Sequence, residues 1–199
     1  MEFYETVNRR RSIRQFTDAP IAREVLERVL EAGLAAPSSD HQRRWELVVL
    51  ADRDRIHELV QIVKPYPCRV KEPKSPQQEM FKIAFPRQRT MIEEAAAVVL
   101  PYFKCKYALD GPQGTYALND FGAAWCVIEN MLLAATAEGL GSVVHIPVKK
   151  EPEQIAALIQ PKKDYQLPAL VMLGHPAPDA EVPAQVEATV AKNVHWNEW

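Results

Sequence analysis

The residues best suited to chemistry lie near the start of the chain, where four arginines fall within six positions. Arg9, Arg10, Arg11 and Arg14 surround Ser12. A guanidinium group presents paired donors that match phosphate oxygens, and a serine hydroxyl with nearby backbone N–H groups completes a phosphate cradle. A solvated basic turn or a nucleic-acid patch would have the same composition, because basic runs are common. Taken alone, this segment indicates an anion site and leaves these alternatives open.

Two further loops have the composition to admit a flat ligand. Residues 36–41 read Ala-Pro-Ser-Ser-Asp-His, and small hydroxyl residues behind a proline let a ligand approach the backbone closely. Residues 139–147 read Gly-Leu-Gly-Ser-Val-Val-His-Ile-Pro, whose glycines permit a ligand to lie against main-chain N–H groups. An ordinary polar connection and a glycine helix cap would look the same. The dinucleotide fingerprint G-x-G-x-x-G is absent.

Composition narrows the class of protein. The 199 residues include 24 basic and 26 acidic side chains, a net charge of −2, so no overall field gathers nucleic acid or an anionic membrane. We expect one domain over residues 1–199. Cys68, Cys105 and Cys126 are odd in number and widely spaced, which indicates a reducing compartment and argues against disulfides and a metal site; Cys126 is expected in the core. With no signal-peptide pattern and no apolar run of spanning length, we expect a cytoplasmic protein that does not enter membranes.

The elements that must position these loops follow from hydrophobic periodicity in the first half of the chain. We expect helices over residues 2–8, 25–33 and 53–63, and a strand over residues 45–50. Four prolines among charged residues predict an irregular segment over residues 64–78. This segment is either a lid over a ligand or a plain surface excursion.

The second half predicts the main core. Residues 93–103 should contain a helix end and a second buried strand, and the clearest helix should begin near Asn119 or Asp120 and be the central buried helix. Later elements should be strands over 142–146 and 167–173 and a helix over 151–159. The tail over residues 178–199 ends in Val194, His195, Trp196 and Trp199, aromatic residues that need a surface, which a second subunit would supply.

Taken together and in this order, the motifs resemble the nitroreductase-like family of FMN-dependent oxidoreductases over nearly the whole chain. The matching motifs are R-R-S-I-R-x-F at 10–16, A-P-S-S at 36–39 with Trp45 before a strand, E-N-M-L-L-A-A at 129–135, G-L-G-S at 139–142, L-G-H-P at 173–176, and the V-H-W-x-x-W ending. The resemblance implies an α+β fold, a three-layer α-β-α sandwich. Its mixed, mainly antiparallel sheet of four to five strands would be flanked by helices, one of them long, central and buried.

The resemblance also assigns roles to residues. Arg10, Arg11 and Ser12 would hold the FMN phosphate, and Arg14 would lie near N1 and O2 of the flavin ring. The other subunit would contribute Pro37, Ser38, Ser39 and His41. The backbone of Val144, His145 and Ile146 would pass the flavin N5 and O4, and Lys192 would complete phosphate binding.

The implied activity is ping-pong hydride transfer from NADH or NADPH through flavin N5 to an electron-poor small molecule such as a nitroaromatic or a quinone. Because the 36–41 loop must reach a phosphate held by another chain, the resemblance implies a homodimer with FMN at the interface. His41 and His145 could donate protons to a reduced acceptor, or could be hydrogen-bonding or packing residues.

Two departures from the family pattern leave alternatives open. Arg43 and Arg44 replace the usual Gln-Pro pair, and Asn193 stands where an arginine is frequent. The substrate could therefore differ, and reductive dehalogenation, enoate reduction and flavin conversion are alternative reactions of the same fold. From a different class, the Arg9–Arg14 cluster could bind nucleic acid in a non-catalytic domain, although the net charge argues against this.

Overall fold

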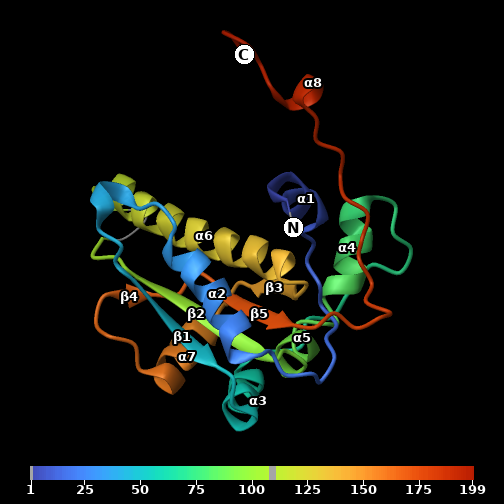
Figure 1. Cartoon of the computed structure of the whole chain (residues 1–199), viewed down its shortest axis with the longest axis horizontal. Coiled ribbons are helices and arrows are strands. Elements are labelled where there is room, and N and C mark those ends of the chain that lie inside the picture. Colours follow the sequence, from blue (N-terminus) through green and yellow to red (C-terminus); the bar gives the residue numbers. More distant parts are fainter. Residues whose placement is uncertain (1, 108–110) are drawn as a thin grey trace.

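A sheet lies between two layers of helices in the computed structural model, which describes residues 2–107 and 111–199 (Figure 1). The sheet runs in the order β1-β2-β5-β3, with the short β4 also paired to β2. Every one of these strand pairs is antiparallel. The strands are β1 (Trp45–Leu50), β2 (Ala97–Lys104), β3 (Gly141–His145), β4 (Tyr165–Gln166) and β5 (Leu170–Gly174). The predicted three-layer α+β fold is confirmed.

One face of the sheet is covered by α2 (Arg23–Leu34) and α6 (Gly114–Ala137), with α1 (Phe3–Arg9) beside α6. Side chains from both larger helices, among them Val29, Ile128 and Met131, have no exposed surface. They pack with Val99 of β2 in one cluster. The long buried helix is thus found where the apolar pattern predicted it.

The opposite face is covered by α3 (Arg53–Ile62), α5 (Thr90–Glu93) and α7 (Glu151–Ile159). Val98 and Leu100 point to this layer whereas Val99 points to the other, because successive side chains of a strand alternate between its faces. Both faces of β2 are therefore apolar, which explains the continuous hydrophobic run at its centre.

The start of α6 differs from the prediction. The helix begins at Gly114, several residues before Asn119 and Asp120, and Asp120 is not its cap. Instead the Asp120 carboxylate lies 3.4 Å from Nη2 of Arg44, which belongs to the chain just before β1. A polar residue that could cap a helix was thus wrongly taken as the helix start.

The irregular segment predicted over residues 64–78 ends earlier than expected. Pro76 starts α4 (Pro76–Ala84), and the Ser75 hydroxyl caps this helix by accepting from the N–H of Gln78 at 3.3 Å. Proline is well tolerated in the first turn, where no intrahelical partner is needed for its nitrogen. The prediction was therefore wrong for the last three residues.

Other boundaries also shift. The fourth long strand was predicted over residues 167–173, whereas β5 runs from Leu170 to Gly174. Cys126, expected in the core, is exposed on the outer face of α6, whereas Cys105 is buried. Cys126 falls between the buried positions Ala124 and Val127, on the side of the helix turned away from the sheet.

The end of the chain leaves the body of the protein. After passing α4, the tail runs outward through the short α8 (Val190–Asn193), and every residue from 190 to 199 is exposed (Figure 1). Trp196 and Trp199 are among the most exposed aromatic side chains. Within the part of the chain that the structure describes, no helix is long and apolar enough to cross a bilayer.

Candidate functional site

The arginine-rich segment lies along β3, at the edge of the sheet. The N–H of Ile13 donates to the carbonyl of Ser142 at 3.0 Å, and Ser12 and Ser142 form a parallel bridge. Farther along, the N–H of Thr17 donates to the carbonyl of His175 at 2.9 Å. Two of the motifs identified in the sequence are therefore hydrogen-bonded side by side.

Two glycines make this close approach possible. A Cβ atom at Gly141 would lie 2.9 Å from the Ile13 side chain, and one at Gly174 would lie 2.8 Å from the ring of Phe16, both inside ordinary contact distance. Gly139 has a different task, since its φ of 77° ends α6 in a left-handed conformation. The glycines of G-L-G-S and L-G-H-P therefore serve a helix cap and the docking of residues 13–16.

The arginines surround Ser12 from several sides. Nε of Arg10 lies 3.5 Å from Oε1 of Glu129 on α6. Nη1 of Arg11 donates to the carbonyls of Asn8 and Arg10, both at 2.7 Å. Nη1 of Arg14 donates to the carbonyl of Ser12 at 3.3 Å, and burial lowers the pKa of this guanidinium.

A cavity of about 480 Å³ opens beside this segment. Its volume is typical of small-molecule sites. Arg11, Ser12 and Arg14 supply the polar wall, and the buried hydroxyl of Ser142, which is paired with Ser12, lacks a hydrogen-bond partner among the described residues. The other walls come from α4 and the tail, namely Pro76, Gln77, Met80 and residues 182–186. Two guanidinium groups and a hydroxyl at one cavity fit a ligand that carries a phosphate.

The second predicted segment lies elsewhere on the molecule. Ser39–His41 form a short 3-10 helix next to the first turns of α6, and none of residues 37–41 lines the cavity beside Ser12. Arg44, after this loop, pairs with Asp120, whereas Arg10 pairs with Glu129, nine residues later on the same helix. Nine residues correspond to about 14 Å along a helix axis. Within one chain, the two halves of the predicted site are therefore not brought together.

The 37–43 loop has an unusual backbone. Asp40, His41 and Arg43 have φ values of 51°, 52° and 44°, a left-handed conformation that residues other than glycine rarely adopt. The hydroxyl of Ser38 helps to hold it by accepting from the N–H of Arg43 at 3.0 Å. Such conformations are concentrated at functional sites. Pro37 and His41 are exposed, and Ser38 and Ser39 are partly exposed.

The third predicted segment, residues 144–146, lies at the end of β3, where two neighbouring side chains point in opposite directions. Ile146 is 56% exposed, whereas His145 is 2% exposed. Nδ1 of His145 lies 2.8 Å from Oε1 of Gln88, and Nε2 lies 3.0 Å from Oε2 of Glu151. Burial lowers the pKa of His145, opposed by the hydrogen bond and charge of Glu151. Of the two roles considered for this side chain, the structure shows hydrogen bonding, and proton donation to a reduced acceptor stays a prediction.

Glu151 is the residue that sequence reasoning missed. Although it is the first residue of α7, it is only 3% exposed. Its carboxylate accepts from the N–H of Val148 at 3.0 Å, the N–H of Lys64 at 3.2 Å and the hydroxyl of Tyr66 at 3.2 Å. Burial would raise the pKa of Glu151, but the hydrogen bonds from Val148, His145 and Lys64 outweigh this effect and lower it. The sequence signal that could have indicated this role is the acidic residue Glu151 six positions after His145, which lies at the end of a strand.

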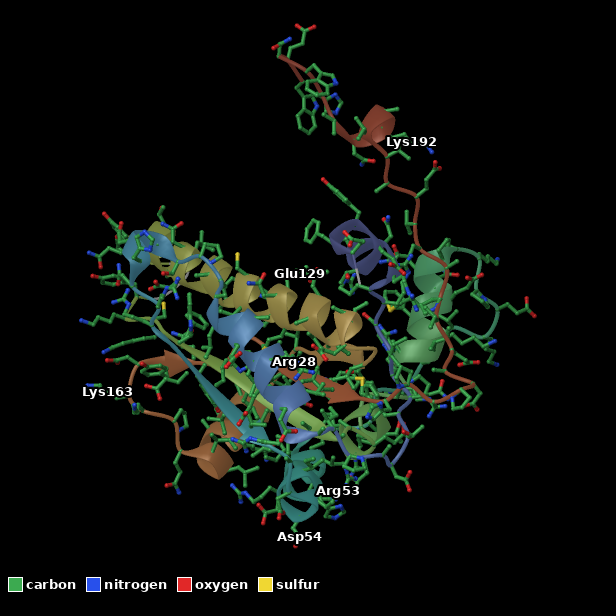
Figure 2. The ribbon with its side chains drawn as sticks, viewed as in Figure 1. Arg28, Arg53, Asp54, Glu129, Lys163 and Lys192 are labelled. Atoms are coloured by element: carbon green, nitrogen blue, oxygen red, sulfur yellow. The ribbon has the colours of Figure 1, made fainter. Side chains whose placement is uncertain are left out.

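Lys192 is not near the arginines in this chain. It pairs with Glu187 on the outgoing tail. Figure 2 shows it well separated from Glu129, the partner of Arg10.

Comparisons with known proteins agree with this fold. The family model described as "Nitroreductase family" matches residues 7–175. The iodotyrosine deiodinase of Nematostella vectensis is 29% identical over 92% of this chain and 70% of its own length. The NAD(P)H-dependent FMN reductase of Bacillus subtilis is 28% identical over 88% of this chain and 66% of its own. The chain thus spans about two thirds of the length of these relatives.

A solved structure extends the comparison to three dimensions. The crystal structure of an iodotyrosine deiodinase bound to FMN and 3-iodo-L-tyrosine superimposes with a TM-score of 0.78, at 17% identity and with 100% of both chains covered. The match in family model, relatives and fold covers the arginine-rich segment, the sheet and the central helix. The chain therefore belongs to the nitroreductase family.

Proposed function

We propose that this protein is an FMN-dependent oxidoreductase that works as a homodimer. The observation that carries the proposal is the cavity lined by Arg11, Ser12 and Arg14, which suits the phosphate end of FMN. Support for the cofactor comes from one relative that is named an FMN reductase and from a similar structure that contains FMN. The whole chain, residues 1–199, is proposed to act as one domain.

Each segment then has a task toward the cofactor. Arg10, Arg11 and Ser12 would bind the phosphate, and the positive charge of Arg14 near the ring would raise the reduction potential of the flavin. The backbone of residues 144–146 would contact the edge of the flavin ring. FMN, when bound, supplies two-electron chemistry, with hydride taken from NADH or NADPH and passed to an acceptor in a ping-pong cycle.

The dimer is proposed because one chain contains only half of this site. Residues 37–41 lie away from the arginines of their own chain, so they would serve the cavity of the partner. A two-fold axis then creates two equal sites. The exposed tail, with Trp196 and Trp199, would cover the partner and could bring Lys192 to the partner's phosphate site. Sedimentation at several protein concentrations tests the dimer, and a monomer at every concentration would contradict it.

The cofactor assignment is tested by FMN retention. Arg10→Ala and Ser12→Ala should give folded protein that loses FMN, because each removes donors to the phosphate. Arg23→Ala is the matched control, since Arg23 is exposed and pairs with Glu27 on its own helix. Binding is measured by quenching of FMN fluorescence. Unchanged retention in both site variants would refute the phosphate assignment.

Reductive dehalogenation is a second candidate reaction, favoured by the relatives that are named iodotyrosine deiodinases. Stopped-flow reduction with NADH and with NADPH, followed by a panel of nitroaromatic, quinone and halophenol acceptors, distinguishes it from nitro reduction. Nucleic-acid binding is less well supported, because the net charge of the chain is −2 and the Arg14 side chain is partly buried. A colourless protein that does not bind FMN but slows the migration of DNA in a gel would favour that alternative.

A further inference from the structure

Glu151 is a buried carboxylate that joins segments far apart in the sequence. Its two oxygens hold Lys64 and Tyr66 from the segment after α3, and Val148 and His145 from the end of β3. A buried charge is costly unless every lone pair finds a donor, and here donors approach both oxygens. The first residue of a surface helix does not need this many hydrogen bonds from other segments.

The segment held by Glu151 lies between two cavities. Pro65, Tyr66 and Pro67 line a cavity of about 380 Å³ on the side of α7 and another of about 450 Å³ on the side of α5. The Tyr66 ring meets the His145 ring edge-on, with centroids 6.1 Å apart. The Tyr66 hydroxyl donates a hydrogen bond to Glu151, which ties this segment to the carboxylate.

The strand end held by Glu151 is the one proposed to lie beside the flavin. His145 points inward to Glu151, and the next residue, Ile146, turns outward and is exposed. The chain then bends back so that the N–H of Val148 also meets the carboxylate. Moving Glu151 would therefore move the backbone of 144–148 and the segment 64–66 together.

We propose that Glu151 is a positioning residue that couples the proline-rich segment 64–67 to the strand end 144–148. This inference rests on the proposed function, since it assigns that strand end to the flavin edge. Contacts of residues 144–148 with FMN would stabilise this strand end, and Glu151 would transmit the stabilisation to 64–67. Glu151 itself does not touch the cofactor.

Glu151→Gln tests the coupling with little change in shape. A glutamine has one acceptor oxygen, so its NH₂ group must face at least one backbone N–H that now donates to the carboxylate, either that of Lys64 or that of Val148. Glu153→Gln is the matched control, because Glu153 lies in the same turn of α7, is exposed and loses the same charge.

Hydrogen exchange followed by mass spectrometry supplies the decisive readout on the full chain. Without FMN, Glu151→Gln should speed exchange of both the 63–67 and 145–149 peptides relative to wild type and Glu153→Gln. With FMN, both peptides should be protected in the wild type, but only 145–149 in Glu151→Gln. We expect FMN to bind this variant about tenfold more weakly, the effect of losing about one net hydrogen bond.

Tyr66→Phe keeps the ring and removes one donor, so it carries the test if Glu151→Gln does not fold. It should reduce the FMN-dependent protection of 63–67 with a smaller loss of affinity. The proposal is overturned if FMN protects 63–67 equally in the wild type and in the variants, or does not protect it in the wild type. A wild-type chain that binds no FMN would instead refute the proposed function, whereas the exchange without FMN tests the Glu151 contacts independently.

Discussion

Adding one methyl group at Gly174 should destabilise the protein through a single side chain. A Cβ there would lie 2.8 Å from Cδ1, 2.9 Å from Cγ and 3.1 Å from Cβ of Phe16, whereas ordinary contacts begin at 3.4 Å. The ring cannot swing aside easily, because Phe16 is 6% exposed and its N–H donates to Glu94 at 3.2 Å. Overpacking of this kind costs about 1–3 kcal/mol of unfolding free energy.

Gly122→Ala is the same chemical change, but it should raise the free energy of unfolding instead of lowering it. Gly122 is exposed in α6, and nothing lies within 4 Å of the position that its Cβ would occupy. Replacing a helical glycine by alanine stabilises by about 0.5–1 kcal/mol. The two variants should therefore change stability with opposite signs.

Urea unfolding at one fixed protein concentration measures both effects, because the proposed dimer makes the midpoint depend on concentration. For a chain of this size, about 1–3 kcal/mol lowers the melting temperature by roughly 2–12 °C. Displacing Phe16 also moves residues 10–14, so Gly174→Ala should retain less FMN. A Gly174→Ala protein that unfolds at the wild-type midpoint would refute the docking of residues 13–16 against this glycine.

Three further predictions concern a cap, a surface ion pair and a buried phenol. Asp52→Ala should cost about 1 kcal/mol in urea unfolding, because the carboxylate accepts from the N–H groups of Asp54 and Arg55 at 3.0 and 3.1 Å at the start of α3; Asp54→Ala, lacking this role, should change little. Arg28→Ala should leave the urea midpoint almost unchanged, because its pair with Glu138 at 2.7 Å is exposed; a loss of stability that persists in high salt would contradict this expectation. Burial raises the pKa of Tyr102 to about 12, so the folded state favours the neutral phenol. The neutral phenol therefore contributes fully to the unfolding free energy below about pH 10, and this contribution is lost as the pH rises through about 12. Unfolding measured across this range should show a shallower decline for Tyr102→Phe than for the wild type, and identical slopes would refute the assignment.

Much of the fold could be predicted from local patterns. The strand over 45–50 and the helix over 151–159 were predicted with the boundaries that the structure shows. The apolar period of α6 marked Ile128 and Leu132 as buried. These predictions were right because burial on one side of an element leaves a period in its own residues, without reference to distant parts of the chain.

Predictions from local patterns were wrong where the role of a residue depends on a partner that is distant in the sequence. Asp120 resembled a helix cap, but its partner is Arg44, and only the packed chain brings the two together. Cys126 was expected in the core, yet it is exposed on the outer side of α6. Irregular composition likewise concealed the cap that Ser75 forms at α4.

The order of motifs along the chain determined the family, and the composition of residues 9–14 predicted an anion-binding site. The tertiary structure decided which segments meet. It placed Ile13 and Phe16 against Gly141 and Gly174, and it kept residues 37–41 away from the arginines of the same chain. It also turned His145 inward to the carboxylate of Glu151, a residue to which the sequence assigned no role. The physical reason is that a side chain's type limits the contacts it can make, whereas burial and hydrogen-bond geometry depend on neighbours supplied by distant parts of the sequence.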